Sequence, residues 1–348
     1  MDIEDALLQV SFTLVRFAGF GANAVLFGLV PILLIVVRPA LKRLDATIYA
    51  PGRAELARRL EGLVQAGLVA SAIAALLAIL LQAVVISTLE NGDVSGSSIA
   101  SVFDTSFGRW YLLRLPLLGA LGVLLVGRVR ATSLSGYAEN EAPPSTTWLQ
   151  MWAVLALGLL ATSTFSGHAA VSQPRGLALF NDVVHLAAGA TWFAGVVVLA
   201  VALPDLWRGR SERERVAALA EMVDLFSNVA FVAIAIVLIT GVLNSFFNLE
   251  SFGDLAGSGY GRTLMLKLTL FVVIVVTGGV NHYALRRRLK REVASDTPAG
   301  SQYLFRRTIA LELAIGLGLM ATTGLLTGLA RTRPASAAPA ISSPAESF

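Results

Sequence analysis

Residues 148–203 read WLQMWAVLALGLLATSTFSGHAAVSQPRGLALFNDVVHLAAGATWFAGVVVLAVAL, which is two long apolar runs joined by a short polar connection. The apolar runs lie at about 148–167 and 180–203. A helix of about 20 apolar residues crosses a hydrocarbon core roughly 30 Å thick. Because backbone polar groups find no water in lipid, each run must be helical. This stretch therefore predicts a transmembrane helical hairpin.

The same pattern recurs along the rest of the 348-residue chain. Six further apolar runs bring the expected number of spans to eight: about 12–37, 62–88, 110–127, 223–247, 263–285 and 308–330. The chain is 55% hydrophobic and only 14% charged, with a mean hydropathy of +0.72. We therefore predict an all-α, polytopic membrane protein, with one eight-helix transmembrane domain over residues 1–333. The Pro/Ala/Ser-rich segment 334–348 is expected to be a disordered tail.

The distribution of Lys and Arg predicts the orientation of this bundle. Segments 38–59, 128–147, 204–222 and 286–307 hold 19 of the 27 basic residues, whereas the opposite loops and the C-terminal tail hold five. Loops rich in Lys and Arg stay in the cytoplasm. Both termini are therefore expected outside, and the basic loops are signals of topology. Nucleic acid is not an expected partner.

Several classes of protein are disfavoured by what the sequence lacks. The absence of cysteine removes disulfides and thiolate metal sites. There is no Gly-rich phosphate loop with GK[ST], no HExxH and no GxSxG, which are the motifs of nucleotide-driven pumps, zinc metalloproteases and serine hydrolases. We therefore expect no enzyme activity.

The opening stretch holds two of the chain's three histidines, His168 and His185. They lie 17 residues apart on successive antiparallel spans, both at the expected outer edge, so the hairpin could bring the two rings to one metal ion. Asp182, one turn before His185, could orient that ring or supply a third ligand. Alternatively, each imidazole caps helix backbone or contacts lipid headgroups, and Asp182 caps its own helix. His282, at the opposite edge, is expected to be structural.

Ionisable residues inside the spans suggest a wet cavity or a path. Arg16, Arg114 and Lys267 lie near the outer ends of three spans, where they could form a shared vestibule. The alternative is that each side chain extends to the outer headgroups. Trp192 closes a face of polar and small residues that begins at Asn181 and includes His185.

The last span carries a stripe of polar and small residues that could line a path inward: Glu312, Gly316, Met320, Thr323 and Thr327. Its alternative is helix packing through the GxxxG of Gly324 and Gly328. Glu312 could instead only pair with Arg306 or Arg307. Among the five methionines, only Met265 and Met320 are placed to assist a metal. Thr240 and Asn244 add inward-facing polarity to the sixth span.

Beyond these residue types, the order of several segments resembles a known family, the copper-resistance protein D family of bacterial inner-membrane proteins. The segments are VRFAGFGANAVLFGLVPILLIVVRPAL (15–41), TSFGRWYLLRL (105–115), SGHAA (166–170), HLAAGATWFAGVVVLAVALP (185–204), YGRTLMLKLTL (260–270) and RRTIALELAIGL (306–317). The resemblance implies movement of copper across the cytoplasmic membrane, with uptake from the periplasm favoured. By this resemblance, His168 and His185 match the copper-binding histidines of the family.

The resemblance also implies a partner, a periplasmic copper-binding β-sandwich protein. Because the segment before the first span is short, this partner is expected to be a separate chain. Imidazole with carboxylate suits Cu(II) or a borderline ion, so the residues permit copper without fixing its oxidation state. Two alternatives stay open. One is a membrane electron carrier with haem b between His168 and His185. The other is an assembly or sensor subunit that binds copper without transporting it.

Overall fold

The computed structural model describes residues 3–89, 93–134, 144–167, 172–207, 209–248, 253–295 and 300–329. In this part of the chain the secondary structure is helical and contains no strand. Eight helices are long and apolar enough to cross a membrane, which confirms the predicted all-α fold and the number of spans. Residues 330–348, which include the predicted tail, lie outside the described residues.

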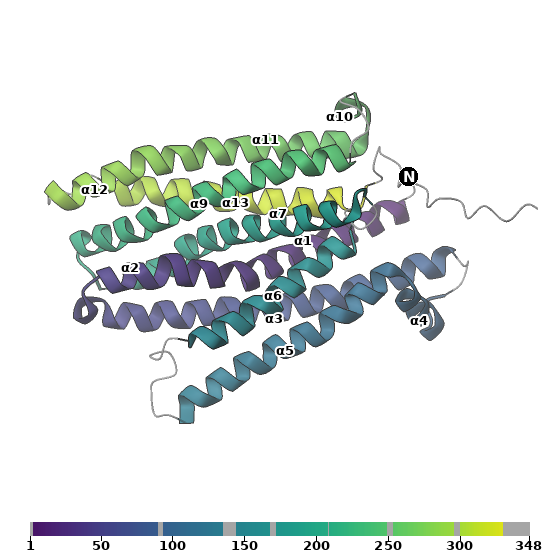
Figure 1. Cartoon of the computed structure of the whole chain (residues 1–348), viewed down its shortest axis with the longest axis horizontal. Coiled ribbons are helices and arrows are strands. Elements are labelled where there is room, and N and C mark those ends of the chain that lie inside the picture. Colours follow the sequence, from purple (N-terminus) through teal and green to yellow (C-terminus); the bar gives the residue numbers. More distant parts are fainter. Residues whose placement is uncertain are drawn as a thin grey trace, which may run out of the picture.

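The helices run roughly along one axis and form an elongated bundle (Figure 1). The long helices and their continuations are α1 (Ile3–Ile32) with η1 (Leu33–Val37) and α2 (Arg38–Arg43), α3 (Ala46–Leu89), α5 (Ser106–Leu134), α6 (Thr146–Phe165), α7 (Arg175–Val197) with η3 (Val198–Ala202) and α8 (Leu203–Leu206), α9 (Glu212–Asn248), α11 (Gly259–Val280) with η4 (Asn281–Leu285) and α12 (Arg286–Ser295), and α13 (Ser301–Leu326). Two short helices, α4 (Gly96–Asp104) and α10 (Asp254–Gly257), lie between spans.

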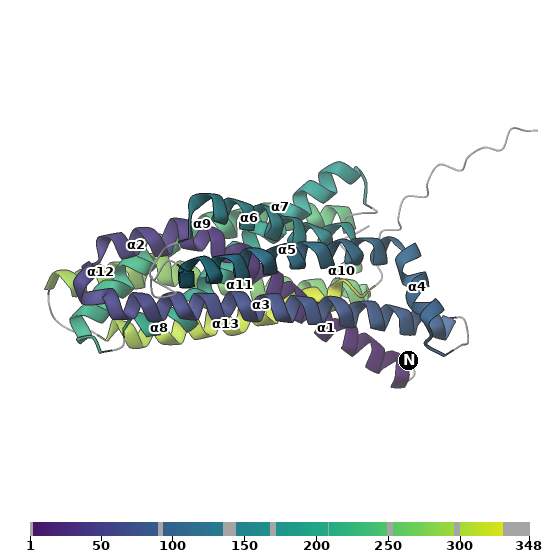
Figure 2. The same ribbon diagram turned by 90° about the horizontal axis from the view of Figure 1, so that it is seen from below.

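The two ends of the bundle differ in what they carry. The start of α1, α4 and α10 lie at one end, and α2 and α12 lie at the other (Figure 1). Following the predicted orientation, we call these the outer end and the inner end. The first turns of α1 diverge from the bundle at the outer end (Figure 2).

Several helices are longer than hydropathy predicted, mainly at the inner end. α3 begins at Ala46, whereas its apolar run begins near residue 62. α9 begins at Glu212, whereas its apolar run begins near residue 223. Backbone hydrogen bonds and helix propensity continue a helix into water after its apolar residues end. Hydropathy therefore marks the part of each helix in lipid and underestimates its full length.

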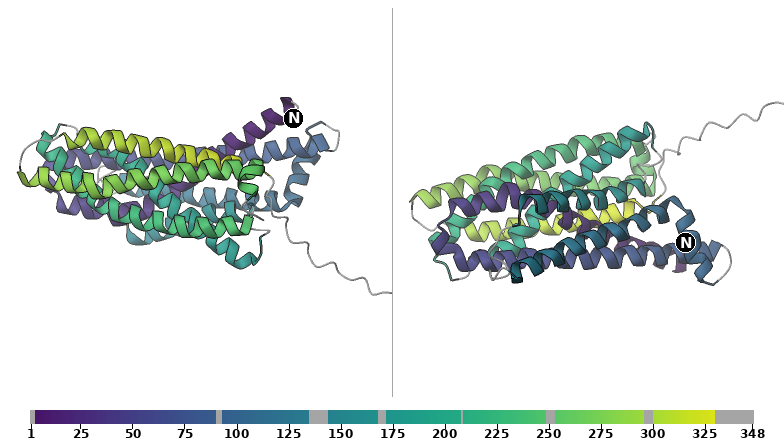
Figure 3. Two further views of the ribbon diagram at one scale, coloured as in Figure 1. Left: turned by 90° about the horizontal axis from the view of Figure 1, so that it is seen from above. Right: turned by 60° about the horizontal axis from the view of Figure 1, so that its bottom comes forward.

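α1 lies at the centre of the bundle and packs against α3, α6, α7 and α13. Two further views show it surrounded by helices that are far apart in the sequence (Figure 3). The contact with α7 is close because residue 28 is glycine: a Cβ atom there would lie 2.1 Å from the carbonyl oxygen of Ala190. This packing sets the depth and rotation of α7, the helix that carries His185.

Three of the long helices contain one π-helical turn each, at η1, η3 and η4. Each turn precedes the short helix that completes its span at the inner end. A π-turn shifts the residues that follow it around the helix axis. The side chains of α2, α8 and α12 therefore lie on faces that a continuous 3.6-residue period does not predict.

Candidate functional site

The position of His185 along its helix differs from the one expected. α7 begins at Arg175, after Pro174, and not near residue 180. His185 is therefore ten residues into the helix, about 15 Å from its start at 1.5 Å per residue. Residues 175–179 continue the helix outward beyond the expected start of the span, and the location of His185 at the outer edge of the membrane stays a prediction. The same helix start places Asp182 in the second or third turn, so the alternative in which Asp182 caps the helix is wrong.

His168 lies outside the described residues, which end at Gly167 on one side and resume at Ser172 on the other. The predicted pairing of His168 with His185 therefore stays a prediction.

A network of polar side chains joins α7 to α9. The amide nitrogen of Asn181 donates to the backbone oxygen of Thr240 at 2.9 Å and to Oδ1 of Asn244 at 2.8 Å. The amide nitrogen of Asn244 donates in turn to Oδ1 of Asp182 at 3.2 Å. Because Asn181 and Thr240 are buried, these bonds satisfy groups that would be costly to leave unpaired in a membrane interior.

His185 belongs to the same network through its ring. Its Nδ1 lies 2.9 Å from Oγ1 of Thr240. That hydroxyl lies 2.6 Å from the backbone oxygen of Ile236, to which it donates its hydrogen. The Thr240 oxygen must therefore accept from Nδ1–H of His185. This assignment follows from the hydrogen-bond network, and it leaves Nε2 of the neutral imidazole with its lone pair available for a metal.

Three further residues define the surroundings of Asp182 and His185. Lys267, from α11, interacts electrostatically with both. Thr164, at the end of α6, lies beside Asp182, and its buried hydroxyl is placed to interact with that carboxyl group. Gly241 on α9 faces the ring of His185: a Cβ atom there would lie 3.4 Å from its Cε1. Four helices, α6, α7, α9 and α11, thus meet around these side chains.

The described residues alone do not complete a metal site. Within them, no group of three His, Cys, Asp or Glu side chains could hold one ion. His185 and Asp182 can supply two ligands, and the chemistry of an imidazole with a carboxylate fits a divalent transition metal. His168, the predicted third member of the site, lies outside the described residues.

Arg114 does not extend to the headgroups. Its side chain is buried, with Nε donating to Oγ1 of Thr162 at 2.7 Å and Nη2 donating to Oγ of Ser163 at 2.9 Å. Its guanidinium also lies over the ring of Tyr111, 4.0 Å from the centroid. Arg114 therefore joins α5 to α6, and the headgroup alternative is wrong for this residue.

The three cations expected in one vestibule have different partners. Arg16 lies over the ring of Phe12, interacts electrostatically with Tyr111, and lies against Gly328 near the end of α13. Arg16 and Arg114 therefore share Tyr111, whereas Lys267 interacts with Asp182. The shared vestibule stays a prediction.

The stripe on α13 makes packing contacts at most of its positions. A Cβ on Gly316 would lie 3.1–3.3 Å from the rings of Phe193 and Trp192, and one on Gly324 would lie 2.9 Å from the backbone oxygen of Thr13. Trp192 is accordingly buried against α13. The Thr323 hydroxyl bonds to Leu319 of its own helix.

The other residues expected along a path have the following positions. Met320 packs against the main hydrophobic core, whereas Met265 is 48% exposed on the outside of the bundle. Glu312 is buried and accepts a hydrogen bond from Asn281 at 2.6 Å. The alternative in which Glu312 only pairs with a neighbouring arginine is therefore wrong.

His282 lies in the π-turn η4, at the inner end and away from the His185 network. Its ring stacks on Phe231 with a centroid distance of 5.9 Å and meets Tyr283 edge-on at 4.8 Å. These aromatic contacts agree with the expected structural role.

The residues that sequence reasoning undervalued are Asn181, Thr240 and Asn244. They appeared as scattered polarity, but they are the direct partners of His185 and Asp182. A usable signal was present: Asn181 and His185 are four residues apart on one helix, and Thr240 and Asn244 are four apart on another. Two such pairs on neighbouring antiparallel helices can face each other.

Comparison with known proteins identifies relatives over most of the chain. The family model described as copper resistance protein D matches residues 220–326. A second model, described as the copper resistance protein D-like N-terminal domain, matches residues 7–177. The described polar network lies partly in each matched region, since Thr164 is in the N-terminal one and Thr240 and Asn244 are in the C-terminal one.

Two curated proteins are similar to the chain. The copper transport protein CutJ of Bacillus subtilis (strain 168) is 29% identical over 259 residues, which is 73% of this chain and 43% of that protein. The inner membrane protein YebZ of Escherichia coli (strain K12) is 30% identical over 154 residues, which is 43% of this chain and 48% of that protein. The chain thus matches less than half the length of these relatives. No solved structure matches it.

Proposed function

The chain belongs to the copper resistance protein D family, and from this premise we propose that it carries copper across the bacterial cytoplasmic membrane, inward from the periplasm. Copper is the cargo in this proposal, and no chemistry is performed on it. The eight membrane-spanning helices and the membrane location named for the relative YebZ support this setting. The name of the relative CutJ, a copper transport protein, supports the cargo.

His185 is the residue that we propose to capture copper, through Nε2. The observation that carries this proposal is the bond between Nδ1 of His185 and Thr240, whose own hydroxyl donates to Ile236. A metal-binding histidine usually donates its second ring nitrogen to a fixed acceptor, which sets the tautomer and the orientation of the ring. Asp182, held by Asn244, is the proposed second ligand. His168 is the proposed third.

The position of His185 along α7 supports capture inside the bundle. An ion that enters from the outer end has to pass about 15 Å along α7 before it meets this ring. Lys267 lies beside the same ligands and interacts with Asp182. Release inward, past Met320 and Glu312 on α13, completes the proposed route. A separate periplasmic copper-binding protein is the proposed donor.

The first test compares three histidine variants in cells. We expect cells that express the wild-type chain to accumulate more copper than cells with an empty vector, as measured by inductively coupled plasma mass spectrometry. His185→Ala and His168→Ala should lower the copper content to that of the empty vector. His282→Ala is the matched control, because it removes the remaining histidine, and it should leave accumulation unchanged. Equal accumulation in His185→Ala and wild-type cells would contradict capture by His185.

A second measurement separates transport from the two alternatives. Copper should enter proteoliposomes that contain the purified wild-type chain, whereas an assembly or sensor subunit would bind copper without flux. A Soret absorption band that is lost in both His168→Ala and His185→Ala would instead establish the haem carrier. Less copper in wild-type cells than in empty-vector cells would reverse the proposed direction.

A further inference from the structure

The inner end of the bundle contains a cavity that the proposed copper route does not use. It has a volume of about 260 Å³ and is lined by His282, Tyr283, Arg286, Arg287 and Lys290. Its lining contains three cations and no carboxylate. From its charge, its position and the surface that leads to it, we infer that this cavity binds the phosphate group of an anionic membrane lipid. The inference does not depend on copper transport.

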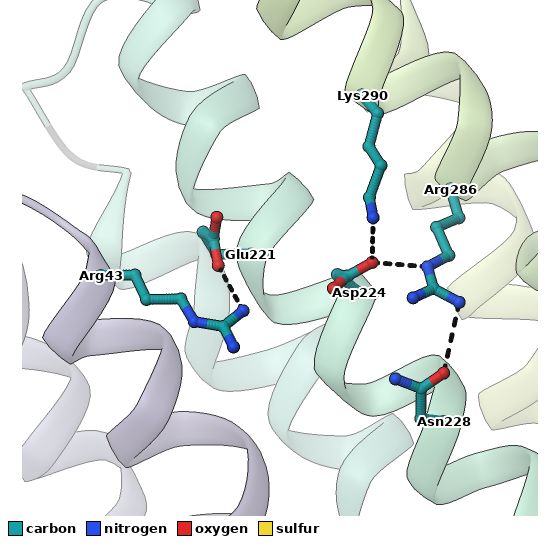
Figure 4. Close-up of polar contacts among 6 residues, drawn as sticks. All are labelled: Arg43, Glu221, Asp224, Asn228, Arg286 and Lys290. Atoms are coloured by element: carbon teal, nitrogen blue, oxygen red, sulfur yellow. Dashed lines mark hydrogen bonds and ion pairs between the residues drawn. The ribbon is translucent and has the colours of Figure 1, made fainter.

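The charge around the cavity is only partly compensated within the described part of the chain. Asp224 accepts from Nε of Arg286 at 2.5 Å and pairs with Nζ of Lys290 at 2.7 Å (Figure 4). Arg286 also donates from Nη1 to Asn228 at 3.2 Å. Arg287 is exposed and has no ion pair among the described residues. Three cations against one carboxylate leave a local charge of +2, which suits a phosphate group.

Asp224 also orders the two cations that it contacts. Figure 4 shows Arg286 and Lys290 side by side on α12, both pointing toward Asp224 on α9. A carboxylate that holds two cationic side chains in place lowers the conformational entropy that they lose when a ligand binds. The cavity is therefore partly organised before its ligand arrives.

The surface that leads to the cavity favours a lipid over a soluble phosphate compound. Val276 and Val280 on α11 precede Tyr283, which itself lines the cavity. These three side chains are 61%, 49% and 60% exposed. This apolar strip on the outside of the bundle ends at the cationic cavity. It matches a lipid, with an acyl chain along the valines and a phosphate at Arg287.

His282, one of the residues that line the cavity, carries a buried polar atom without a partner. Nδ1 of His282 is buried and has no hydrogen-bond partner in the described part of the chain. Buried polar atoms are normally satisfied, and an exception calls for an unseen water or ligand. The ring is held by stacking on Phe231, which is itself 61% exposed on the outside of α9. The ring also meets Tyr283, and tyrosine is enriched at the interface between headgroups and acyl chains.

The test measures lipid retention by the full purified chain. Delipidated protein is incubated with equal amounts of dioleoyl phosphatidylglycerol and dioleoyl phosphatidylcholine, and the bound lipids are counted by native mass spectrometry. We expect phosphatidylglycerol to be retained in preference. In the double variant Arg287→Gln/Lys290→Gln, its retention should fall at least about fivefold, since each lost charge near a membrane surface weakens anion binding by about 1 kcal/mol.

The matched control is Arg306→Gln/Arg307→Gln. These two exposed arginines also lie at the inner end, and Arg307 contacts Tyr303, but they do not line the cavity. The control should retain phosphatidylglycerol as the wild type does. The charge-preserving variant Arg287→Lys/Lys290→Arg should restore most retention, which excludes loss of folding as the cause. An equal loss in both glutamine variants, or no restoration, would overturn the inference.

Two further outcomes identify the source of the phosphate. Equal retention of phosphatidylcholine and phosphatidylglycerol would show that the cavity does not select anionic lipid. Displacement of phosphatidylglycerol by millimolar inorganic phosphate would assign the cavity to a free phosphate ion. Either result overturns the lipid assignment, whereas selective retention that resists phosphate supports it.

Discussion

The polar contacts around His185 and those around Asp224 are built differently, although both join α9 to a neighbouring helix. Around His185, amides and hydroxyls bond to one another, to a histidine ring and to the carboxyl group of Asp182, beside which Lys267 lies. Around Asp224, charged side chains pair directly, and Lys290 is 57% exposed. The first network fixes a ring and leaves one of its nitrogens available. The second neutralises charge at the edge of the membrane and holds α12 against α9.

The difference follows from the solvent at each depth. In the hydrocarbon region, an unpaired polar group costs several kcal/mol, so neutral groups that bond fully to each other are the stable solution. Near the headgroups, water and counter-ions screen charge, and exposed ion pairs contribute only about 0–1 kcal/mol. The stability that the hydrogen bonds around His185 (the outer network) contribute should therefore depend on side-chain shape and not on salt. The stability that the ion pairs of Asp224 (the inner pairs) contribute should depend on salt and little on shape.

The largest effect should come from removing the acceptor that orients His185. Thr240→Val keeps the volume of the side chain but removes Oγ1, so Nδ1 of His185 loses its partner. Loss of such an outer-shell partner typically lowers metal affinity by about 10–100-fold. We expect this fall in copper affinity when the purified chain is titrated against a competing chelator.

Two variants control the Thr240 experiment. Thr240→Ser retains the hydroxyl and should recover most of the affinity. Thr269→Val removes an exposed hydroxyl on α11 that bonds only to Met265 of its own helix, and it should have no effect. If Thr240→Val binds copper as tightly as the wild type does, the hydroxyl does not position the ring for copper.

A smaller effect on stability should follow the loss of Asn244. Asn244→Leu removes the donor to Asp182 and the acceptor of Asn181. Interhelical hydrogen bonds in membranes contribute about 0.6 kcal/mol each, and up to about 1.7, so two lost bonds predict about 1–2 kcal/mol. The free energy of unfolding in mixed detergent micelles measures this loss, which should not change with ionic strength.

Asn248→Leu, one turn later on α9, is the control for Asn244. The amide nitrogen of Asn248 bonds to the backbone oxygen of Asn244 within the same helix. Asn248→Leu should lower the free energy of unfolding by less than half as much as Asn244→Leu does. Equal losses at the two positions would show that the bonds between α7 and α9 contribute nothing beyond a local effect.

The smallest effects are expected at the inner ion pairs. Asp224→Asn leaves two cations without their carboxylate and should cost about 1 kcal/mol at low salt. Glu221→Gln removes only the ion pair with Arg43. Because the Glu221 and Arg43 side chains are 34% and 51% exposed, the loss of folding free energy should be smaller. Both losses should shrink as salt rises from about 0.05 to about 0.5 M, because the Debye length shortens. A salt-independent loss at Asp224 would remove the contrast with the outer network.

Much of the fold could be predicted from the sequence, and less of the site. The apolar runs determined that there are eight spans, because each run must satisfy its own backbone in lipid. The sequence also identified His185 and Asp182 as neighbours on one helix. It missed that Arg175–Leu179 belongs to the same helix, because hydropathy marks the apolar run and not the full length of the helix. His168 remains a candidate on sequence grounds alone.

The sequence by itself determined the class of protein, the number of helices and the identity of the few polar residues within them. Only the tertiary structure decided which of those residues meet: Asn181 with Asn244, His185 with Thr240, and Arg114 with Thr162. The reason is physical. Hydropathy is a property of each segment alone, whereas the meeting of side chains about 50–60 positions apart depends on the depth and rotation of each helix. Close packing sets both, as at Gly28, where α1 approaches the backbone of α7.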